Sequence, residues 1–587
     1  MVYRNQNTIE MKKTLVLFVI IFSIHNIQAN LLVRNTNNVK TNTDVSTDDF
    51  TCADFTAGIV YVNTAATGTN TGTSWTNAFT DLQTALTTVK NCAALTTIYV
   101  AEGTYYPTSG TDRTISFKII YDVNIYGGFS PTNGAVDLAT RNATTYKTSL
   151  SGNIGNTSIA TDNSLSVLQM YYNSSSPFDV ILDGLTITEG YDDNEGLYPG
   201  IFVSGSATAL INNCEITNHY SRPGFWGAAL NIDSGPLSRV VTIKNSKIKN
   251  NTNGGNGGAI SIKTEKTVKI INTIFDGNTA IRGAGIYLTD STMEGIALDI
   301  TNSVFVNNNS THSTSEGTID QSNSALNLNI KNSIFWNNIY NGSTTDVKAS
   351  ITRPTLVGTK HTIISNSIIA NYEGSGSSTW ASNNIVDAGN NLDTDPLFTD
   401  LANGNFTLQS TSPAIDTGDN SAVTEATDIV GNTRITDGDG DLTSTVDIGV
   451  YEAPRNPCLD FPNKVYVNAL ATGLNDGTSW ANAYTSLQDA LNNPLTCFNK
   501  EIWVAKGTYK PHNSDQSVYF SPPKNVSIYG GFNGTETLVT ERNWYENPTI
   551  LSGDLNNSNS ANAGDSHTIF YIEKDNVVLD GLIFENS

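Results

Sequence analysis

The chain has 587 residues, and its 55 acidic against 32 basic side chains give it a net charge of −23. This balance argues against nucleic acid as a partner, because phosphate recognition requires clusters of lysine and arginine. Charged residues make up only 15% of the chain, against about 25% in ordinary soluble domains, and the composition is typical of an extracellular all-β protein rather than a cytosolic enzyme.

The first segment predicts export. Lys12 and Lys13 precede an apolar run over residues 15–24, and Ala29 supplies a small residue for cleavage. We therefore predict a signal peptide over 1–29, starting at Met11, and a polar linker over 30–50. No later stretch has the roughly 18 consecutive apolar residues of a membrane span. We expect a mature chain without a transmembrane segment, secreted or on the outer cell surface.

The five cysteines form two matching pairs and one remainder. Cys52 and Cys92 recur in a similar context as Cys458 and Cys497, and an oxidising compartment permits disulfides. We predict the disulfides Cys52–Cys92 and Cys458–Cys497, and a buried free thiol at Cys214.

A helix is predicted near the start of two similar segments. Apolar residues from Trp75 to Val89 recur at spacings of three and four, which favours an amphipathic helix capped by Thr73 or Ser74. Residues 480–491 repeat the pattern. We interpret each helix as a lid, because the open end of a solenoid exposes unpaired backbone. A catalytic role for the tryptophans is the alternative.

A short frame then repeats along the chain. It consists of two alternating aliphatic residues, a key residue, and Ile or Phe three residues later. The key residues are Gly184, Asn213, Asn245, Asn272, Asn302, Asn332 and Asn366. Alternation predicts strands with one buried face, and a period of about 30 residues predicts stacked coils. We predict a right-handed parallel β-helix over 51–385.

The key asparagines are explained by turn chemistry. Asparagine tolerates left-handed backbone, and we expect identical amides on successive coils to hydrogen-bond as a ladder. A third strand is expected after each turn, as at 227–230, 257–260 and 283–286.

The frame also predicts an apolar stripe on the outside of the later coils. If the Ile or Phe three residues after the key Asn faces the core, the residue before it faces out. These residues are Ile274, Val304, Ile334 and Ile368. Since a bare stripe would invite association, we predict that the region around Leu397, Phe398 and Phe406 folds back along it. The alternative is a partner-binding groove.

Several motifs resemble those of known families. The GGAI sequence at 257–260 and the FxxN sequences at 275–278, 305–308 and 335–338 resemble repeats of chlamydial polymorphic outer-membrane proteins. Residues 386–455 contain the sequences DPLF, SPAID and VDIGVYE, and they resemble the choice-of-anchor Q segment of secreted β-helix proteins from Bacteroidetes-like bacteria. The resemblance implies a pectin-lyase-like fold, a closing role for 386–455 and a surface location. It leaves the activity open.

Residues 456–587 begin a second copy of the β-helix. Residues 60–63 recur at 465–468, and 126–129 recur at 529–532. The copy stops where regular coils would begin, so we expect the protein to continue, with any C-terminal anchor beyond Ser587.

An acidic loop is the candidate metal site. Asp437, Asp439 and Asp441 alternate with glycine, and Asp447 follows. Carboxylates at this spacing can converge on Ca²⁺, although Leu442 stands where an EF-hand requires glycine. The alternative is a solvated acidic turn. No cofactor is required by the function we expect.

The candidate ligand-binding residues lie in loops after successive coils: Tyr191, Asp192, Tyr220, Arg222 and Trp226. Aromatic rings beside hydrogen-bonding groups suit a sugar or a partner protein. Plain loop packing is the alternative.

Catalytic residues are not predicted. A lyase of this fold needs a basic residue beside carboxylates that hold Ca²⁺, and a glycosidase needs two carboxylates about 5–9.5 Å apart. The outward positions of the frame, such as Thr242 with Lys244 and Lys269 with Ile271, show no recurring acidic pair. The acidic pI of about 4.5 and the small number of cationic residues also disfavour binding of anionic polysaccharides, unless metal ions reverse the local sign. We therefore expect a non-catalytic, adhesin-like surface protein that binds glycans or partner proteins. A polysaccharide lyase or glycoside hydrolase is the alternative, and a passive stalk the second.

Overall fold

The structure is a computed structural model that divides into two compact units, which are described separately: a first unit ending at Arg434 but including Val446–Glu452, and a second unit with Ile435–Thr445 and Ala453–Ser587. The structure describes residues 51–171, 176–193, 196, 198–233, 235, 238–263, 266–288, 297–312, 317–321, 327–352, 362–439, 443–454, 464–492, 500–523, 526–558, 560, 562–573 and 576–586.

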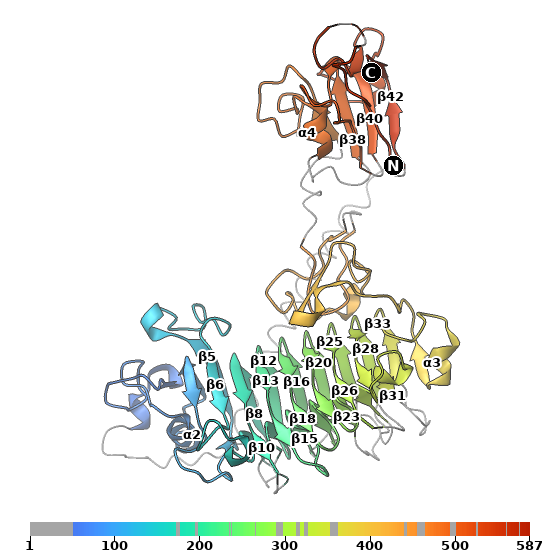
Figure 1. Cartoon of the computed structure of the whole chain (residues 1–587). Coiled ribbons are helices and arrows are strands. Elements are labelled where there is room, and N and C mark those ends of the chain that lie inside the picture. The colour runs from blue at the N-terminus through green and yellow to red at the C-terminus, as the bar shows by residue number, and fades with distance from the viewer. Residues whose placement is uncertain are drawn as a thin grey trace, which may run out of the picture. The chain divides into compact units, whose positions relative to one another are not determined.

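The first unit is an all-β parallel solenoid, as predicted (Figure 1). Its largest sheet has eleven strands, in the order β1 (Ile59–Val62), β2 (Thr97–Ala101), β5 (Val123–Phe129), β8 (Phe178–Asp183), β12 (Ala207–Asn212), β16 (Val240–Lys244), β20 (Thr267–Ile271), β24 (Ala297–Thr301), β28 (Asn327–Lys331), β32 (Thr362–Ser365) and β34 (Ile385–Asp387). The nine-stranded sheet runs β3 (Gly103–Tyr105), β6 (Thr148–Ser151), β9 (Leu185–Thr188), β13 (Glu215–Thr217), β17 (Lys247–Lys249), β21 (Ile274–Asp276), β25 (Val304–Val306), β29 (Ile334–Trp336) and β33 (Ile368–Ile369).

Two further parallel sheets complete the coils. The eight-stranded sheet contains the predicted third strands and runs β31 (Ile351–Thr352), β27 (Ile319–Asp320), β23 (Ile286–Leu288), β19 (Ile260–Ile262), β15 (Leu230–Ile232), β11 (Ile201–Val203), β7 (Leu168–Met170) and β4 (Phe117–Lys118). The six-stranded sheet runs β10 (Tyr191–Asp192), β14 (Tyr220–Ser221), β18 (Thr252–Asn253), β22 (Thr279–Ala280), β26 (Asn309–Ser310) and β30 (Ile339–Tyr340). Each coil therefore stacks on the next through matching strands.

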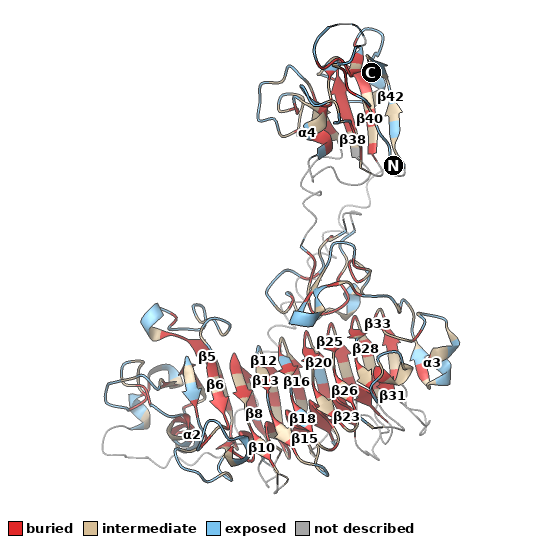
Figure 2. Ribbon diagram, viewed as in Figure 1, coloured by how far each residue is buried: buried red, intermediate tan, exposed pale blue. Residues whose placement is uncertain are grey.

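The interior of the solenoid follows the predicted alternation (Figure 2). Aliphatic residues of successive coils form one continuous core, as Val268 and Ile270 do beside Leu298 and Ile300. Phe275, Phe305 and Phe335 stack inside it with ring centroids 4.3 and 4.5 Å apart. Burial of these stacked side chains is the main stabilising force of the coil.

The helices are few and shorter than predicted. The described residues contain the α-helices α2 (Leu82–Asn91), α3 (Ser378–Ser382) and α4 (Leu487–Asn492). The cap of α2 is Asp81, whose carboxylate accepts from Thr84 N at 2.8 Å, so the predicted caps Thr73 and Ser74 are wrong. Single 3-10 turns are formed by η1 (Cys52–Asp54), η2 (Thr56–Gly58), η3 (Pro131–Asn133), η4 (Ala160–Asp162), η5 (Val347–Ala349), η6 (Leu401–Asn403), η7 (Asn420–Ala422) and η9 (Val539–Glu541).

Trp75 lies outside α2, in an aromatic cluster on the outer face of the eleven-stranded sheet. Its ring centroid is 4.9 Å from that of Tyr61 and 5.3 Å from that of Phe129. Its Nε1 donates to Val136 O at 2.9 Å. The tryptophan therefore ties the loop after β5 to the sheet, and it belongs to no helical lid.

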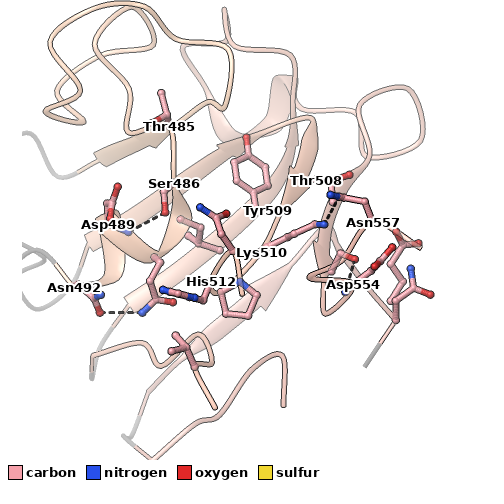
Figure 3. A pocket seen from close by; sticks show the side chains of 18 residues that line it. Thr485, Ser486, Asp489, Asn492, Thr508, Tyr509, Lys510, His512, Asp554 and Asn557 are labelled. Atoms are coloured by element: carbon pink, nitrogen blue, oxygen red, sulfur yellow. Dashed lines mark hydrogen bonds between the residues drawn. The ribbon is translucent and has the colours of Figure 1, made fainter. Parts of the chain in front are cut away.

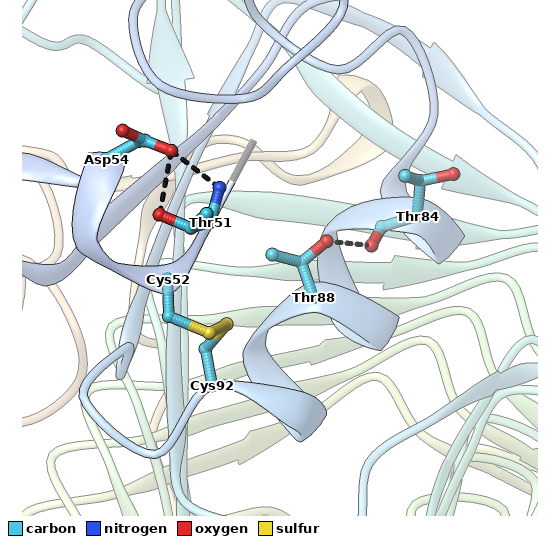
Figure 4. Close-up of a disulfide and its surroundings, with 6 residues drawn as sticks. All are labelled: Thr51, Cys52, Asp54, Thr84, Thr88 and Cys92. Atoms are coloured by element: carbon cyan, nitrogen blue, oxygen red, sulfur yellow. Dashed lines mark hydrogen bonds between the residues drawn. A yellow bond between two sulfur atoms is a disulfide. The ribbon is translucent and has the colours of Figure 1, made fainter. Parts of the chain in front are cut away.

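The predicted disulfide Cys52–Cys92 is present and joins η1 to the end of α2 (Figure 4). Cys458 and Cys497 lie outside the described residues. Cys214 is a buried free cysteine, as predicted. Its backbone N donates to Ser246 Oγ at 3.1 Å, the same contact that Ser303 N makes to Ser333 Oγ, so its thiol takes the place of a hydroxyl in a row of small polar side chains.

The key asparagines adopt the left-handed backbone, with φ between 47° and 51°. Their predicted amide ladder is confined to one pair, in which Asn272 Nδ2 donates to Asn245 Oδ1 at 3.1 Å. The later amides face residues 417–449 instead: Asn332 accepts from Asp419 N at 2.8 Å, and Asn366 donates to Thr417 O at 3.3 Å. The ladder was predicted at the wrong position for most of its length.

A buried ladder is instead formed by the asparagines of the FxxN motifs, Asn278, Asn308 and Asn338, and by Asn251 before them. Each Oδ1 accepts from the backbone N and from Nδ2 of the preceding member, as Asn308 does from Asn278 at 3.2 and 2.9 Å. Each Nδ2 also donates to a carbonyl one coil back, as Asn308 does to Phe275 O at 3.0 Å. The ladder satisfies polar groups that would otherwise be buried without partners.

His219 occupies the position of this ladder one coil before Asn251, and its backbone N donates to Asn251 Oδ1. Its Nδ1 accepts from Gly190 N and its Nε2 donates to Ile187 O, both at 3.0 Å, which repeats the contacts of the asparagines. This arrangement requires a neutral ring, and burial lowers the pKa of His219 to about 4. The role of His219 is therefore structural.

Acid should therefore destabilise the solenoid through His219. The unfolded residue has a pKa of about 6.5, so the unfolded chain binds the proton more readily between pH 6.5 and 4. The free energy of unfolding should be undiminished above pH 6.5 and should fall by about 3 kcal/mol as the pH drops to 4. Urea unfolding across this range should show a smaller slope for His219→Asn, which restores the ladder residue. Equal slopes for the two proteins would contradict this role.

The closing segment, residues 388–434 and 446–452 of the first unit, covers the predicted stripe. It contains the hairpin β35 (Phe398–Asp400) and β36 (Asn405–Leu408). Ile274, Val304, Ile334 and Ile368 are at most 4% exposed, and they belong to an apolar cluster separate from the coil interior. Closing-segment members of the cluster are Phe398, Phe406, Ala414, Ile448 and Val450. The predicted outward orientation of these four side chains, and their cover by the closing segment, are thus confirmed. The alternative of a partner-binding groove at this stripe is wrong. Leu397 does not join the cluster.

The second unit repeats the start of the solenoid. One sheet runs β37 (Lys464–Val467), β38 (Lys500–Ala505), β40 (Val526–Phe532) and β42 (Val578–Asp580), and another β39 (Gly507–Tyr509), β41 (Thr549–Ser552) and β43 (Leu582–Glu585). Trp480 lies outside α4 and donates to Glu536 O at 2.9 Å, as Trp75 does to Val136 O. The duplication therefore extends to side-chain contacts.

Across the described residues, none of the helices has the length and apolar character of a membrane span.

Candidate functional site

A groove on the outer face of the nine-stranded sheet is the candidate binding site of the first unit. It encloses about 560 Å³. Its floor is formed by β9, β13 and β17 and the turns before them, including Thr186, Glu215 and Lys247. The turn at Ala143–Lys147 forms one wall, and Ile429 and Val430 of the closing segment form the other. In Figure 1 these two walls stand on either side of β12 and β13.

The first wall is held rigidly. Arg141 donates to Gly127 O at 3.0 Å and forms an ion pair with Asp183 at 2.5 Å. Asn142 N donates to Gly128 O at 2.7 Å, and Asn142 Oδ1 accepts from the backbone N of Thr144 at 3.0 Å. Gly128 has φ of 87°, and a Cβ there would lie 2.7 Å from the backbone of Ala143, so glycine is required for this close approach.

The second wall is held by polar contacts with the coils. Lys244 pairs with Glu425 at 2.9 Å, and Asn272 Nδ2 donates to Thr427 O at 2.9 Å. Asp428 Oδ1 accepts from the backbone N of Val430 at 2.9 Å. Val430 itself is 62% exposed. The groove therefore exists because the closing segment is docked on the solenoid.

The groove has a local positive character. Lys147 and Lys247 are exposed and form no ion pair with any residue that the structure describes. The carboxylate of Glu215 is paired with Lys249 at 3.1 Å. At distances below the Debye length of about 8 Å, unpaired charges act on a ligand more strongly than the net charge of the whole chain. The expectation that this protein attracts anionic polysaccharides poorly rests on the charge of the whole chain, and it stays a prediction.

A cysteine thiol is one candidate nucleophile at the groove. Cys214 lines it, but its Sγ lies 3.2 Å from Asn212 O, and burial raises the pKa of the thiol to about 12. The thiol stays protonated at neutral pH and is a poor nucleophile. Within the described residues, no side chain of the groove belongs to a group of three acidic, histidine or cysteine side chains able to share a metal ion.

The predicted ligand-binding residues lie elsewhere and are only partly brought together. Tyr191 and Tyr220 stack on neighbouring strands β10 and β14, with ring centroids 4.6 Å apart. Asp192 is fully buried, so its prediction as a surface ligand is wrong; alternation along β10 turns it inward. The guanidinium of Arg222 lies 4.7 Å from the ring of Phe225, and Lys263 Nζ lies 5.3 Å from the ring of Trp226.

The structure brings two of the predicted metal ligands together, since a carboxylate oxygen of Asp437 and one of Asp439 lie within 4.8 Å of each other. Asp441 lies outside the described residues. Asp437 and Asp439 belong to the second unit, the first buried and the second exposed. Asp447 belongs to the first unit, is 1% exposed, and accepts from Asp416 N at 2.8 Å. Asp447 therefore helps to fold the closing segment, and a Ca²⁺ site on the acidic loop stays a prediction.

A second cavity, of about 900 Å³, lies in the second unit (Figure 3). Several of its polar side chains hydrogen-bond to neighbouring residues. Lys510 Nζ donates to Asn557 Oδ1 at 2.6 Å, and His512 Nδ1 accepts from the backbone N of Asp515 at 2.8 Å. Asp554 accepts from Ser558 N at 3.0 Å. These contacts fix the rim of the cavity.

Sequence reasoning missed Lys147 and Lys247. Lys247 stands two residues after a key asparagine, the outward position at which later coils carry Ile274 and Val304. A lysine at a position that is aliphatic in later coils was therefore a sign, visible in the sequence, that this part of the outer face is different. Lys147 had no such signal, because its loop belongs to no repeat.

Comparison with known proteins gives limited information. No protein-family model matches the chain, so its resemblance to the chlamydial and choice-of-anchor Q families stays a prediction. No curated protein matches either.

Similar solved structures include a pectate lyase and an alginate lyase. The pectate lyase Pel9A is 16% identical, with a TM-score of 0.36, over 68% of this chain and 96% of that one. A mutant of the PL6 family alginate lyase AlyGC is 13% identical, with a TM-score of 0.22, over 83% of this chain and 68% of that one. The sheets of this chain identify it as a parallel β-solenoid.

Proposed function

We propose that this protein is an exported surface protein that binds an acidic polysaccharide in the groove of its first unit. The observation that carries the proposal is the pair Lys147 and Lys247, both exposed and without an ion pair among the described residues, in a chain of net charge −23. Carboxylate or sulfate groups of a glycan are their natural partners. Thr144 and Thr186 of the same groove can hydrogen-bond to sugar hydroxyls.

Cleavage of the polysaccharide is the second candidate function. The similar solved structures are named as lyases, and the groove places lysines beside a carboxylate, which is part of what β-elimination uses. In that reaction a base takes the proton next to the uronate carboxylate, the bond to the leaving sugar oxygen breaks, and an unsaturated sugar remains. Binding without cleavage is favoured because both lysines are solvent-exposed, whereas a catalytic site excludes water from the reacting groups.

The test is a panel of soluble polysaccharides with and without acidic groups. Affinity electrophoresis with polygalacturonate, alginate and dextran should show retardation by at least one acidic polymer and none by dextran. Lys147→Gln with Lys247→Gln should weaken this binding about 10- to 100-fold, because two charge-assisted contacts are lost.

The matched control is Lys118→Gln with Lys269→Gln, which removes the same charge from two exposed positions outside the groove. Its binding should equal that of the wild type. Equal losses in the two double variants would contradict a specific site, and no binding to any polymer would favour a passive stalk. Release of ultraviolet-absorbing unsaturated sugars would establish the lyase alternative.

A further inference from the structure

The second unit carries a pair of exposed aromatic side chains at the turn that corresponds to the first wall of the groove. Trp544 and Tyr545 stand where the first unit has Ala143 and Thr144. Their side chains are 45% and 85% exposed. The ring centroids lie 5.8 Å apart, with the planes inclined by 40°. Large exposed rings on a polar β-protein are a mark of a binding surface.

The turn beneath these rings is as rigid as its counterpart. Asn543 N donates to Gly531 O at 2.8 Å, and Asn543 Oδ1 accepts from Tyr545 N at 3.1 Å. Arg542 pairs with Asp580 at 2.6 Å, and its guanidinium lies 5.3 Å from the ring centroid of Trp544. The backbone of the turn is therefore fixed before any ligand arrives, and Arg542 packs against the ring of Trp544, which lowers the entropic cost of binding.

The two copies share this turn and differ in the side chains that are exposed on it. Arg141 and Arg542 make equivalent contacts to a glycine carbonyl and to an aspartate in the coil beside them. Thr144 stands at the position of Tyr545 in the first unit, and it is exposed although further coils follow there. The position of Tyr545 therefore faces solvent in a continued solenoid as well.

The charges around the rings select the ligand. Pro548 replaces the lysine found at position 147, and Glu541 and Glu546 are exposed beside the turn. Hydrogen bonds from Thr537 N and Leu538 N lower the pKa of Glu541, so it is ionised at neutral pH. An acidic glycan would be repelled here, whereas the CH face of a neutral sugar ring packs well against an aromatic face.

We infer that Trp544 and Tyr545 form a stacking site for a neutral polysaccharide. The rings bind the apolar face of the pyranose units, and Asn543, Glu541 and Glu546 provide polar groups near their hydroxyls. The site is separate from the groove of the first unit and does not rest on the function proposed for it. The protein would thus recognise two chemically different glycans through two copies of one scaffold.

The test replaces the two aromatics by the residues of the first copy, Trp544→Ala with Tyr545→Thr, in the full chain. Affinity electrophoresis in gels with glucomannan, xylan or hydroxyethylcellulose should show retardation of the wild type and at least about a tenfold weaker effect in the variant. The control is Tyr519→Thr with Tyr571→Thr, a second exposed aromatic pair of the same unit with centroids 5.4 Å apart. It should behave as the wild type.

Three outcomes would overturn the inference. The first is a wild type that none of the neutral polymers retards. The second is an aromatic variant that binds as well as the wild type. The third is a variant that changes only the oligomeric state measured by light scattering. The two double variants distinguish this site from the groove. Loss of Lys147 and Lys247 should leave binding to the neutral polymers intact. Loss of Trp544 and Tyr545 should leave binding to acidic polymers intact.

Discussion

Replacing Arg434 by methionine should release the closing segment from the solenoid at a cost of about 3–5 kcal/mol. Arg434 and Glu452 form an ion pair in which both side chains are 1% exposed. The guanidinium also donates to Asn272 Oδ1 at 2.6 Å and to the carbonyls of Gly449 and Val450, each at 3.1 Å. Without it, four buried acceptors lose a donor.

The loss is large because, among the described residues, Arg434 is the one positive charge paired with Glu452, whose other contact is a hydrogen bond from the backbone N of Asp447 at 3.2 Å. Burial raises the pKa of Glu452, and the positive charge of Arg434 beside it acts in the opposite direction. In Arg434→Met the carboxyl must take up a proton or remain as an uncompensated buried charge. In Glu452→Gln the shape is kept, but the guanidinium of Arg434 cannot release its proton and is left as an uncompensated buried charge, so we expect a comparable loss of about 3–5 kcal/mol.

The measurement combines unfolding with limited proteolysis. Arg434→Met should become sensitive to protease within residues 388–434, while the coil core keeps its urea midpoint. The same variant should also bind acidic polysaccharide more weakly, because Ile429 and Val430 no longer form a wall of the groove. A variant in which this segment stays as resistant as in the wild type would show that Arg434 is not its anchor.

The second large effect is expected at Asn308, in the middle of the buried ladder. Leucine at this position has a similar volume but leaves Asn278 N, Asn278 Nδ2 and Phe275 O without their partner. Each unsatisfied buried group costs about 1–3 kcal/mol, and neighbouring losses are not additive. We expect Asn308→Leu to lower the free energy of unfolding by about 3–5 kcal/mol.

Asn329→Leu is the matched control. Asn329 lies on the outer face of the eleven-stranded sheet and donates to Asp299 at 2.8 Å from a partly exposed position. Water can replace this contact, so its loss should cost about 1 kcal/mol or less. Urea unfolding followed by tryptophan fluorescence compares the two variants. Similar midpoints would mean that the buried amides contribute no more than surface ones.

Much of the fold was predictable because it is repetitive. The spacing of Val268, Ile270 and Phe275 recurs in successive coils, and this regularity determines which side chains face the core. The same reasoning predicted the outer stripe at Ile334 and its cover by Phe398 and Phe406, since a solenoid of known facing leaves few places for a following apolar segment.

The rest depended on contacts that no local pattern contains. The residues around Trp75 have helical spacing, yet the ring packs on Tyr61 of β1, and the helix begins only at Leu82. The key asparagines have the expected backbone conformation, but their amides hydrogen-bond to a distant segment. Asn332, for example, accepts from Asp419 N, about 90 residues away. His219 carries no sequence signal of its ladder role because it replaces the asparagine of that ladder.

The candidate site was the least predictable part. The groove arises where a loop outside the repeat, at Lys147, and the closing segment, at Val430, stand on either side of ordinary coils. Neither wall belongs to the repeat, so the repeat could not reveal the space between them. Only the lysine at position 247 marked this face as different from that of the later coils.

Hydrogen exchange with and without a bound acidic polysaccharide tests the account most directly. We predict that binding protects the backbone amides of residues 143–147, 213–215, 245–247 and 429–430, the two walls and the floor of the groove, and leaves the loops at 191–193 and 220–226 unchanged. Protection of those loops, with the groove residues exchanging as they do in the free protein, would contradict the assignment of the binding site.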